Sequence, residues 1–202
     1  MDIEVKRSLD KFMNHQFVEC ISCALNVRDP LTGEHSRRVT QLSCLLCGVL
    51  QLTQEMAMQI NLAANLHDIG KIGISDAVLL KPDKLSDDEW YQMKKHPCIG
   101  AEILSKSEFY EGIRQIILHH HERYDGKGYP DGAKGDEIPL GSRIIAICDS
   151  IDAMASDRAY RKAMSLDACK EEIKKNIGLM YDPVIAETML NNWYIAESIY
   201  SA

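Results

Sequence analysis

The chain has 202 residues, a formal net charge of −7 at pH 7 and an isoelectric point near 5.5. This acidic balance argues against a binder of DNA, RNA or anionic membranes, because such proteins present net basic surfaces. The sequence contains no run of about 18 apolar residues, so it predicts no transmembrane helix. Its charged N-terminus also lacks an apolar signal segment. We therefore expect a cytoplasmic protein whose seven cysteines stay reduced.

The spacing of apolar residues predicts helices along nearly the whole chain. Several of them begin at capping residues, namely Thr53, the pair Ser86 and Glu89, Ser165 and Asp182. We expect helices at about residues 3–27, 34–50, 53–67, 86–95, 97–105, 109–121, 141–155, 165–178 and 183–199. At most a short hairpin is expected within the turn-rich segment 127–140. The fold class predicted is all-α, a compact helical bundle.

We expect one domain over residues 1–202, with an N-terminal helix (1–28) and a catalytic core (29–202). The N-terminal helix is expected either to support a homodimer or to be the remainder of a longer protein. Two cysteine pairs, 20/23 and 44/47, have the spacing of zinc sites but lie in continuous apolar stretches without turn residues. We interpret them, and Cys98 and Cys148, as buried helix positions.

Three consecutive histidines stand in the segment HHHERYDGKGYP, residues 119–130. If the preceding helix continues through them, His120 and His121 share the phase of its apolar face, whereas His119 points away. Buried imidazoles need partners for their polar nitrogens, and metal ligation supplies such partners. The segment therefore favours a metal site over an ordinary core.

Further ligand-type side chains fall at inward positions or helix ends on other helices. They are His35, His67, Asp68, His96, Asp149 and Asp152. A single one of them is more often a hydrogen-bonded core residue or a helix cap. Together with the histidine pair they indicate more than one metal ion, and a nitrogen and oxygen donor set without thiolate favours iron, manganese or another divalent metal.

In these residues the chain resembles the HD-GYP family of HD-domain phosphohydrolases. The likeness rests on His35, the pair His67-Asp68, His96, the histidine pair 120–121, the turn Gly128-Tyr129-Pro130 and Asp149. It extends from about Asp29, through DRAYRKA at 157–163, to YDP at 181–183, which is most of the chain. The resemblance implies a metal-dependent phosphodiesterase that hydrolyses cyclic di-GMP to linear pGpG, and in some members on to GMP.

The resemblance also implies roles for individual residues. The first of two metals would be held by His35, His67, Asp68 and Asp149, and the second by Asp68, His96, His120 and His121. The two ions would lower the pKa of a bridging water, so that hydroxide can attack the phosphorus. Lys71 would reach the attacked phosphate, while Tyr129, Arg158 and Arg161 would contact the guanines or phosphates. Glu122 is expected to orient an imidazole.

One departure from the family concerns the number of metals. Some members hold a third ion through a glutamate four residues before the first histidine, where this chain has Leu31. Because leucine has no donor atom, we expect two metals and question the onward hydrolysis of pGpG. The segments IGKIG and DGKG do not match the spacing of a phosphate-binding P-loop.

Two alternative functions stay open. The first is an HD hydrolase of another substrate, such as a cyclic GMP-AMP dinucleotide, a nucleoside phosphate or a guanosine tetraphosphate alarmone. The GYP turn and the second histidine set argue against the latter two. The second alternative is a cyclic di-GMP sensor without turnover, against which the complete ligand set argues.

Overall fold

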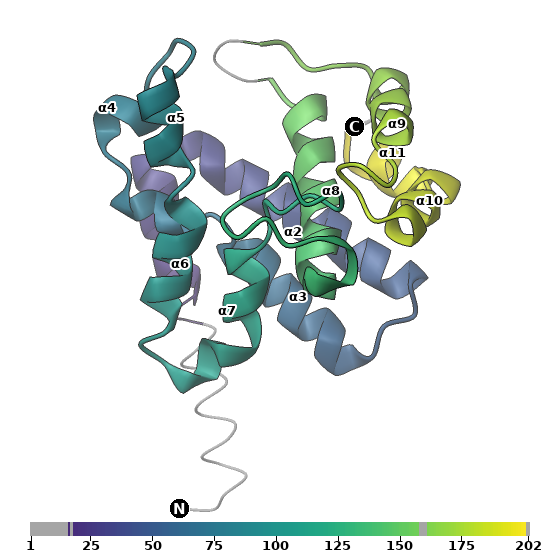
Figure 1. Cartoon of the computed structure of the whole chain (residues 1–202), viewed down its shortest axis with the longest axis horizontal. Coiled ribbons are helices and arrows are strands. Elements are labelled where there is room, and N and C mark those ends of the chain that lie inside the picture. The colour runs from purple at the N-terminus through teal and green to yellow at the C-terminus, as the bar shows by residue number, and fades with distance from the viewer. Residues whose placement is uncertain (1–15, 17, 158–160, 201–202) are drawn as a thin grey trace, which may run out of the picture.

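The computed structural model describes residues 16, 18–157 and 161–200 of the chain (Figure 1). Residues 18–28, here called the N-terminal helix, are helical. The later elements are α2 (Pro30–Val49), α3 (Gln54–Leu66), η1 (Ile69–Gly73), α4 (Asp76–Leu79), α5 (Asp87–Met93), α6 (His96–Leu104), η2 (Glu108–Tyr110), α7 (Glu111–Leu118), η3 (Gly135–Glu137), α8 (Leu140–Ala155), α9 (Leu166–Lys175), α10 (Pro183–Asn191) and α11 (Tyr194–Tyr200). The described residues contain no strand, which confirms the all-α prediction.

The predicted capping residues begin helices as expected. Thr53 accepts a hydrogen bond from the backbone N–H of Met56, and Ser86 forms a complete capping box with Glu89. Ser165 caps α9 and Asp182 caps α10 in the same way. Each cap satisfies backbone donors that a helix leaves free in its first turn.

Other boundaries differ from the prediction. Helix α2 begins at Pro30, four residues early, because proline suits the first helical position. The short helices α4 and η1 were not expected, although α3 ends at Leu66, within one residue of the predicted end. The predicted last helix is split at residues 192–193, where the side-chain amide of Asn192 donates to the carbonyl of Thr188 at 2.8 Å.

Residues 127–140 form turns and the single turn η3 rather than a hairpin. The predicted first helix, 3–27, falls partly outside the described residues, so its N-terminal half is untested. The helix predicted for 109–121 starts two residues late and ends at Leu118, before the histidines.

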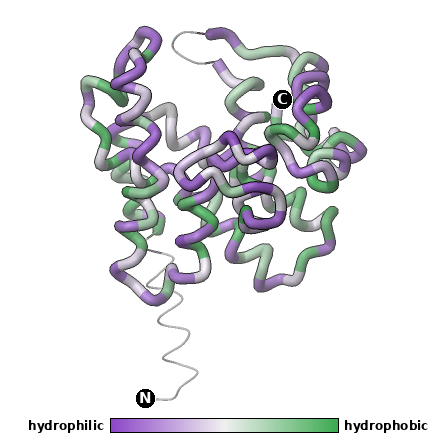
Figure 2. The backbone as a smooth tube through the Cα atoms, in the orientation of Figure 1, coloured by the Kyte–Doolittle hydropathy of each residue, from purple (hydrophilic) through white to green (hydrophobic). Residues whose placement is uncertain are grey.

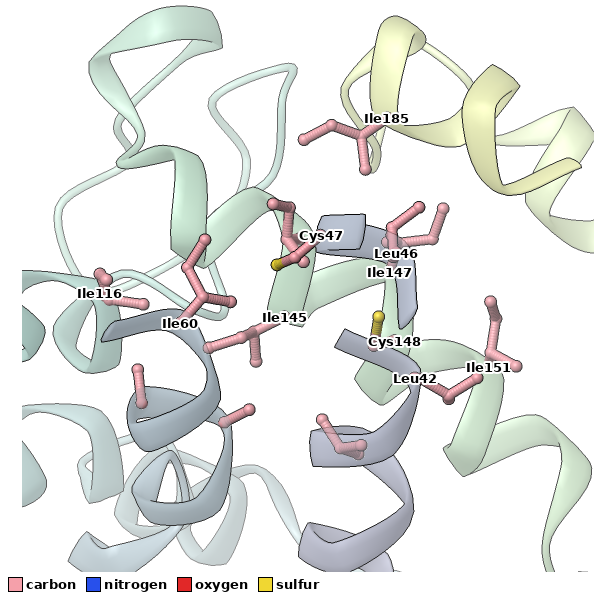
Figure 3. Packing of buried hydrophobic residues seen from close by; sticks show 14 of the residues in the cluster. Leu42, Leu46, Cys47, Ile60, Ile116, Ile145, Ile147, Cys148, Ile151 and Ile185 are labelled. Carbon is pink, nitrogen blue, oxygen red and sulfur yellow. The ribbon is translucent and has the colours of Figure 1, made fainter. Parts of the chain in front are cut away.

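Helix α8 runs through the middle of the bundle, with α4 to α7 on one side and α9 to α11 on the other (Figure 1). It packs against α2, which also packs against α3. Leu42 and Leu46 of α2 lie near Ile147, Cys148 and Ile151 of α8 in the buried core (Figure 3). Hydrophobic and hydrophilic residues alternate along the helices (Figure 2), as expected for helices that bury one face.

The cysteines follow the prediction only in part. Cys47, Cys148 and Cys169 are buried, but Cys20, Cys23, Cys44 and Cys98 are exposed, so those four are not core residues. They lie on the outer faces of their helices, which the apolar stretches around them concealed. No helix among the described residues is long and apolar enough to cross a membrane.

Candidate metal centre

Seven side chains from five parts of the fold converge on one site. They are His35 on α2, His67 and Asp68 at the end of α3, His96 at the start of α6, His120 and His121 in the turn after α7, and Asp149 on α8. Within each of three groups the donor atoms lie within 4.8 Å of one another. The groups are His35, His67 and Asp149; His96, His120 and His121; and His67, Asp68 and His120. All seven predicted ligands are thus brought together.

Three of the histidines are oriented by the end of a helix. The Nδ1 atoms of His67, His96 and His120 lie 2.7, 2.9 and 2.6 Å from the carbonyl oxygen three residues earlier in the chain. A carbonyl only accepts, so each Nδ1 carries the proton. Carbonyls at helix ends lack helical partners, and these imidazoles provide one. The contact of His120 with Ile117 also explains why α7 stops before the histidines.

The opposite nitrogens of these rings face the interior of the site with their lone pairs. The Nε2 atom of His67 is buried and has no hydrogen-bond partner. The Nε2 atoms of His96 and His120 lie 3.3 Å apart, although neither carries a proton when its Nδ1 donates. Such unpartnered lone pairs fit a metal cation, which satisfies all of them at once.

Asp68 lies between the two main groups. Its Oδ1 atom is 3.4 Å from Nε2 of His96, and its Oδ2 atom is 3.5 Å from Nε2 of His67 and 3.8 Å from that of His35. The Lys71 ammonium donates to Oδ2 at 2.7 Å. Burial opposes the charged carboxylate, but Lys71 and the surrounding imidazoles hold the pKa of Asp68 well below its ordinary value.

His35 is held between two aspartates of α8. Its Nε2 atom lies 3.1 Å from Asp149 and its Nδ1 atom lies 2.7 Å from Oδ2 of Asp152. Burial opposes the charged imidazole, yet the hydrogen bonds to both carboxylates outweigh it and raise the pKa of His35 to about 9. Asp152 therefore plays the orienting part for His35 that backbone carbonyls play for the other rings.

Burial keeps three further imidazoles neutral. It lowers the pKa of His96 to about 3 and that of His121 to about 4, and it holds the pKa of His120 well below its ordinary value. Neutral imidazole is the form that binds metals. The donor set of nitrogens and carboxylate oxygens, without a thiolate, suits divalent transition metals such as iron and manganese.

The turn Gly128-Tyr129-Pro130 borders the second group. The Tyr129 ring lies 4.9 Å from the His121 ring at 33°. A Cβ atom on Gly128 would lie 2.4 Å from the backbone of Glu122 and Arg123, so the turn needs glycine there. The Tyr129–Pro130 peptide bond is cis.

Glu122 has a role other than the one predicted. Its buried Oε1 atom accepts the backbone N–H groups of Asp131 at 2.8 Å and Gly132 at 3.0 Å. The closest imidazole is that of His119, 3.7 Å away, and His119 belongs to none of the metal-binding groups. Glu122 thus fixes the loop that carries Tyr129, and the expectation that it orients a ligand imidazole is wrong.

A family model described as an HD domain matches residues 19–185. The chain belongs to the HD-domain family. The HD domain is 44% identical over 169 residues to the cyclic di-GMP phosphodiesterase response regulator RpfG of Xanthomonas campestris pv. campestris (strain 8004), with 83% of this chain and 45% of that protein covered. It is 36% identical over 180 residues to the 3′3′-cGAMP-specific phosphodiesterase 2 of Vibrio cholerae, with 88% and 34% covered. The chain spans less than half the length of these relatives.

The fold has a counterpart among solved structures. The HD domain matches the cyclic GMP-AMP specific phosphodiesterase V-cGAP3 of V. cholerae with a TM-score of 0.69 at 18% identity. The match covers 91% of this chain and 50% of that one. This likeness confirms the helical fold, and the HD-domain match together with the sequence relatives confirms the predicted resemblance.

Of the two arginines expected to contact the substrate, Arg158 and Arg161, the structure describes only Arg161. Arg161 donates to the carbonyl oxygens of Ala153 and Met154 at the end of α8 of the HD domain. Its guanidinium therefore lies at the C-terminal end of the helix that carries Asp149. Arg158 lies outside the described residues.

Sequence reasoning missed three residues that act on the site from outside. Arg38 and Tyr200 donate to Oδ1 of Asp152 at 2.5 and 2.6 Å, and Arg28 contacts η1. Asp152 itself was noted only as an inward carboxylate. The position of Asp152, one helical turn after Asp149, was the sequence signal that it belongs to the site. No nearby residue marks Tyr200, which lies 48 residues from Asp152 in the chain.

Proposed function

We propose that this HD domain is a two-metal phosphodiesterase that hydrolyses cyclic di-GMP to linear pGpG. The observation that carries the proposal is the pair of donor groups on either side of Asp68, whose carboxylate oxygens lie 3.4 Å from Nε2 of His96 and 3.5 Å from Nε2 of His67. Relatives of this chain named as cyclic di-GMP phosphodiesterases support the substrate.

We propose the same division of ligands between two ions as the sequence predicts. His35, His67 and Asp149 would hold one ion, the three histidines 96, 120 and 121 would hold the other, and Asp68 would touch both. When bound, the ions would neutralise phosphate charge and lower the pKa of a coordinated water. We propose iron or manganese, because the donors are imidazoles and carboxylates.

The remaining residues would bind and orient the dinucleotide. Lys71, at the edge of the site beside Asp68, would stabilise charge on a non-bridging phosphate oxygen. Tyr129 borders the second group and would contact a guanine or phosphate, with Arg158 and Arg161 as further contacts. Asp68 and Lys71 are thus the proposed catalytic residues.

We propose two metals and not three, with pGpG as the main product. Position 31 is leucine, so the glutamate that would hold a third ion is absent from the sequence. The N-terminal segment 1–28 remains a proposed dimerisation element, of which residues 1–15 and 17 lie outside the described part.

A second candidate substrate is the cyclic GMP-AMP dinucleotide. The observation that favours it is the 36% identity to a 3′3′-cGAMP-specific phosphodiesterase. Both substrates present the same phosphodiester to the metals, so discrimination must come from contacts to the bases. A sensor without turnover is less favoured, because seven ligand side chains are retained in metal-binding arrangement.

The test is to purify the chain without oxygen, load it with iron or manganese, and follow cyclic di-GMP and 3′3′-cGAMP by chromatography beside Asp68→Ala. Conversion of cyclic di-GMP to pGpG by the unmutated chain alone is expected. Preference for cGAMP would assign the second substrate. Binding of cyclic di-GMP without cleavage would establish the sensor and refute the proposal.

A further inference from the structure

Arg28, the last residue of the N-terminal helix, reaches across to η1, the segment that carries Lys71. Its Nη1 atom donates to the carbonyl oxygens of Lys71 at 3.0 Å and Ile72 at 2.5 Å. Its Nη2 atom donates to the carbonyl oxygen of Ile74. One guanidinium therefore binds three carbonyls of a single turn, across a separation of 43 to 46 residues.

The carboxylate of Asp76 completes this contact. Its Oδ1 atom accepts from Nε of Arg28 at 3.0 Å and from Nη2 at 2.7 Å. The Arg28 side chain is only 27% exposed, whereas that of Asp76 is 70% exposed. The ion pair alone would contribute little at such exposure, so the bonds to the η1 carbonyls are the informative part.

Segment η1 needs outside support, because short 3₁₀ turns have poor hydrogen-bond geometry and leave carbonyls free at their ends. On its inner side it is pressed against α6: a Cβ atom on Gly70 would lie 1.8 Å from the carbonyl oxygen of His96. On the other side Arg28 binds its last carbonyls. Because η1 carries Lys71 and is held between α6 and Arg28, its position determines where the Lys71 ammonium lies relative to Asp68.

We propose that Arg28 is a positioning residue that holds η1 so that Lys71 points into the metal centre. The inference rests on the proposed phosphodiesterase function, in which Lys71 contacts the phosphate. It makes the N-terminal helix a working part of the catalytic site. Because the guanidinium fork contacts three carbonyls at once, no other side chain, lysine included, reproduces it.

The test combines Arg28→Met with Lys71→Met in a double-mutant cycle on the full chain. Arg28→Met keeps the aliphatic stem and removes the donors. Arg37→Met is the matched control, since Arg37 donates only to the neighbouring surface side chains of Glu34 and Gln41 among the described residues. Metal content, kcat and KM for cyclic di-GMP are measured for each, with amide hydrogen exchange at Ile74, whose N–H donates to Lys71.

We expect Arg28→Met to retain its metals, to lower kcat about tenfold, and to speed exchange at Ile74, with Arg37→Met unchanged. In the Lys71→Met background the same change should alter kcat less than about twofold, because the effect passes through Lys71. Equal losses in both backgrounds, or unchanged exchange, would overturn the inference. If the unmutated chain cleaves nothing, the proposed function fails, and the exchange rate alone then decides whether Arg28 holds η1.

Discussion

His96 and His120 face one another through their Nε2 atoms at 3.3 Å, while each Nδ1 is bound to a backbone carbonyl. With the protons on Nδ1, two lone pairs meet, and burial prevents either ring from relieving the contact by taking up a proton. A cation bound by both rings relieves it. The pair therefore indicates that the protein is built around a metal it binds.

Metal binding should raise the stability of the chain. At a free metal concentration 100 times Kd, binding contributes about 2.7 kcal/mol, and for a chain of this size we expect Tm to rise by about 5–10 °C. Differential scanning calorimetry with metal and with a chelator measures the shift. His120→Ala should lose most of it and the neighbouring His119→Ala should keep it; equal behaviour of the two would contradict the ligand assignment.

Asp152→Asn should weaken binding of the metal that we propose His35 to hold. The substitution removes the charge that fixes the His35 ring, and loss of such a supporting partner lowers metal affinity about 10- to 100-fold. Competition with a coloured chelator gives the affinity. Ser156→Ala is the control, because Ser156 only touches Asp152 at 3.4 Å. Unchanged affinity in Asp152→Asn would show that the contact is structural.

Lys71→Met should separate catalysis from metal binding. The Lys71 ammonium pairs with Asp68, and a protonated ammonium has no lone pair with which to bind a metal. We expect full metal content with kcat lowered about 100-fold, as on removal of one charge-stabilising donor. Elemental analysis and a cyclic di-GMP assay test this; loss of metal in parallel with kcat would give Lys71 a structural role instead.

Gly128→Ala should disturb the turn that carries Tyr129. The added Cβ would collide with backbone at 2.4 Å, so the turn must move, at a cost of about 1–3 kcal/mol. Gly48→Ala is the matched control: nothing lies within 4 Å of a Cβ there, and a helical alanine stabilises by up to about 1 kcal/mol. Urea unfolding measures both, and a neutral Gly128→Ala would contradict the packing of this turn.

The metal-free chain should lose stability as pH falls from about 6.5 to 4. In this window unfolded histidines, with an ordinary pKa near 6.5, take up protons, whereas burial lowers the pKa of His96 to about 3 and that of His121 to about 4. Each such group lowers the free energy of unfolding by at most about 1.4 kcal/mol per pH unit. His35, whose pKa is raised to about 9, stays protonated in the folded chain, so it opposes this loss mainly near and above pH 6.5, where the unfolded imidazole is not yet fully protonated.

Urea unfolding at about pH 6 and pH 4.5 measures this slope. A free energy of unfolding that is equal at the two pH values would contradict the burial of neutral imidazoles.

The sequence identifies the side chains that converge on the site better than it predicts the geometry that orients them. Capping residues such as Ser86 and Asp182 act on donors two or three residues away, so they set helix starts from local sequence alone. The end of α7 depends on the His120 ring binding a carbonyl, which helical periodicity does not reveal. The helical phase still predicts correctly that His120 is buried, because the turn begins directly after Leu118 and keeps His120 on the inner side of α7.

Long-range contacts lie beyond such reasoning. Arg28 and η1, and Tyr200 and Asp152, are joined only once the chain has folded. Glu122 was given the wrong partner for the same reason, since the backbone N–H groups it accepts lie nine and ten residues onward in a turn. The four exposed cysteines were wrongly predicted to be buried, because an apolar stretch does not reveal which face of the helix packs against the core.

The most direct test of the two-metal centre is a crystal structure of the metal-loaded chain, with anomalous scattering recorded at the iron and manganese edges. We expect two peaks about 3.5–4 Å apart, one beside His35, His67 and Asp149 and the other beside the histidines 96, 120 and 121, with Asp68 touching both. A single peak, or peaks away from Asp68, would contradict the account.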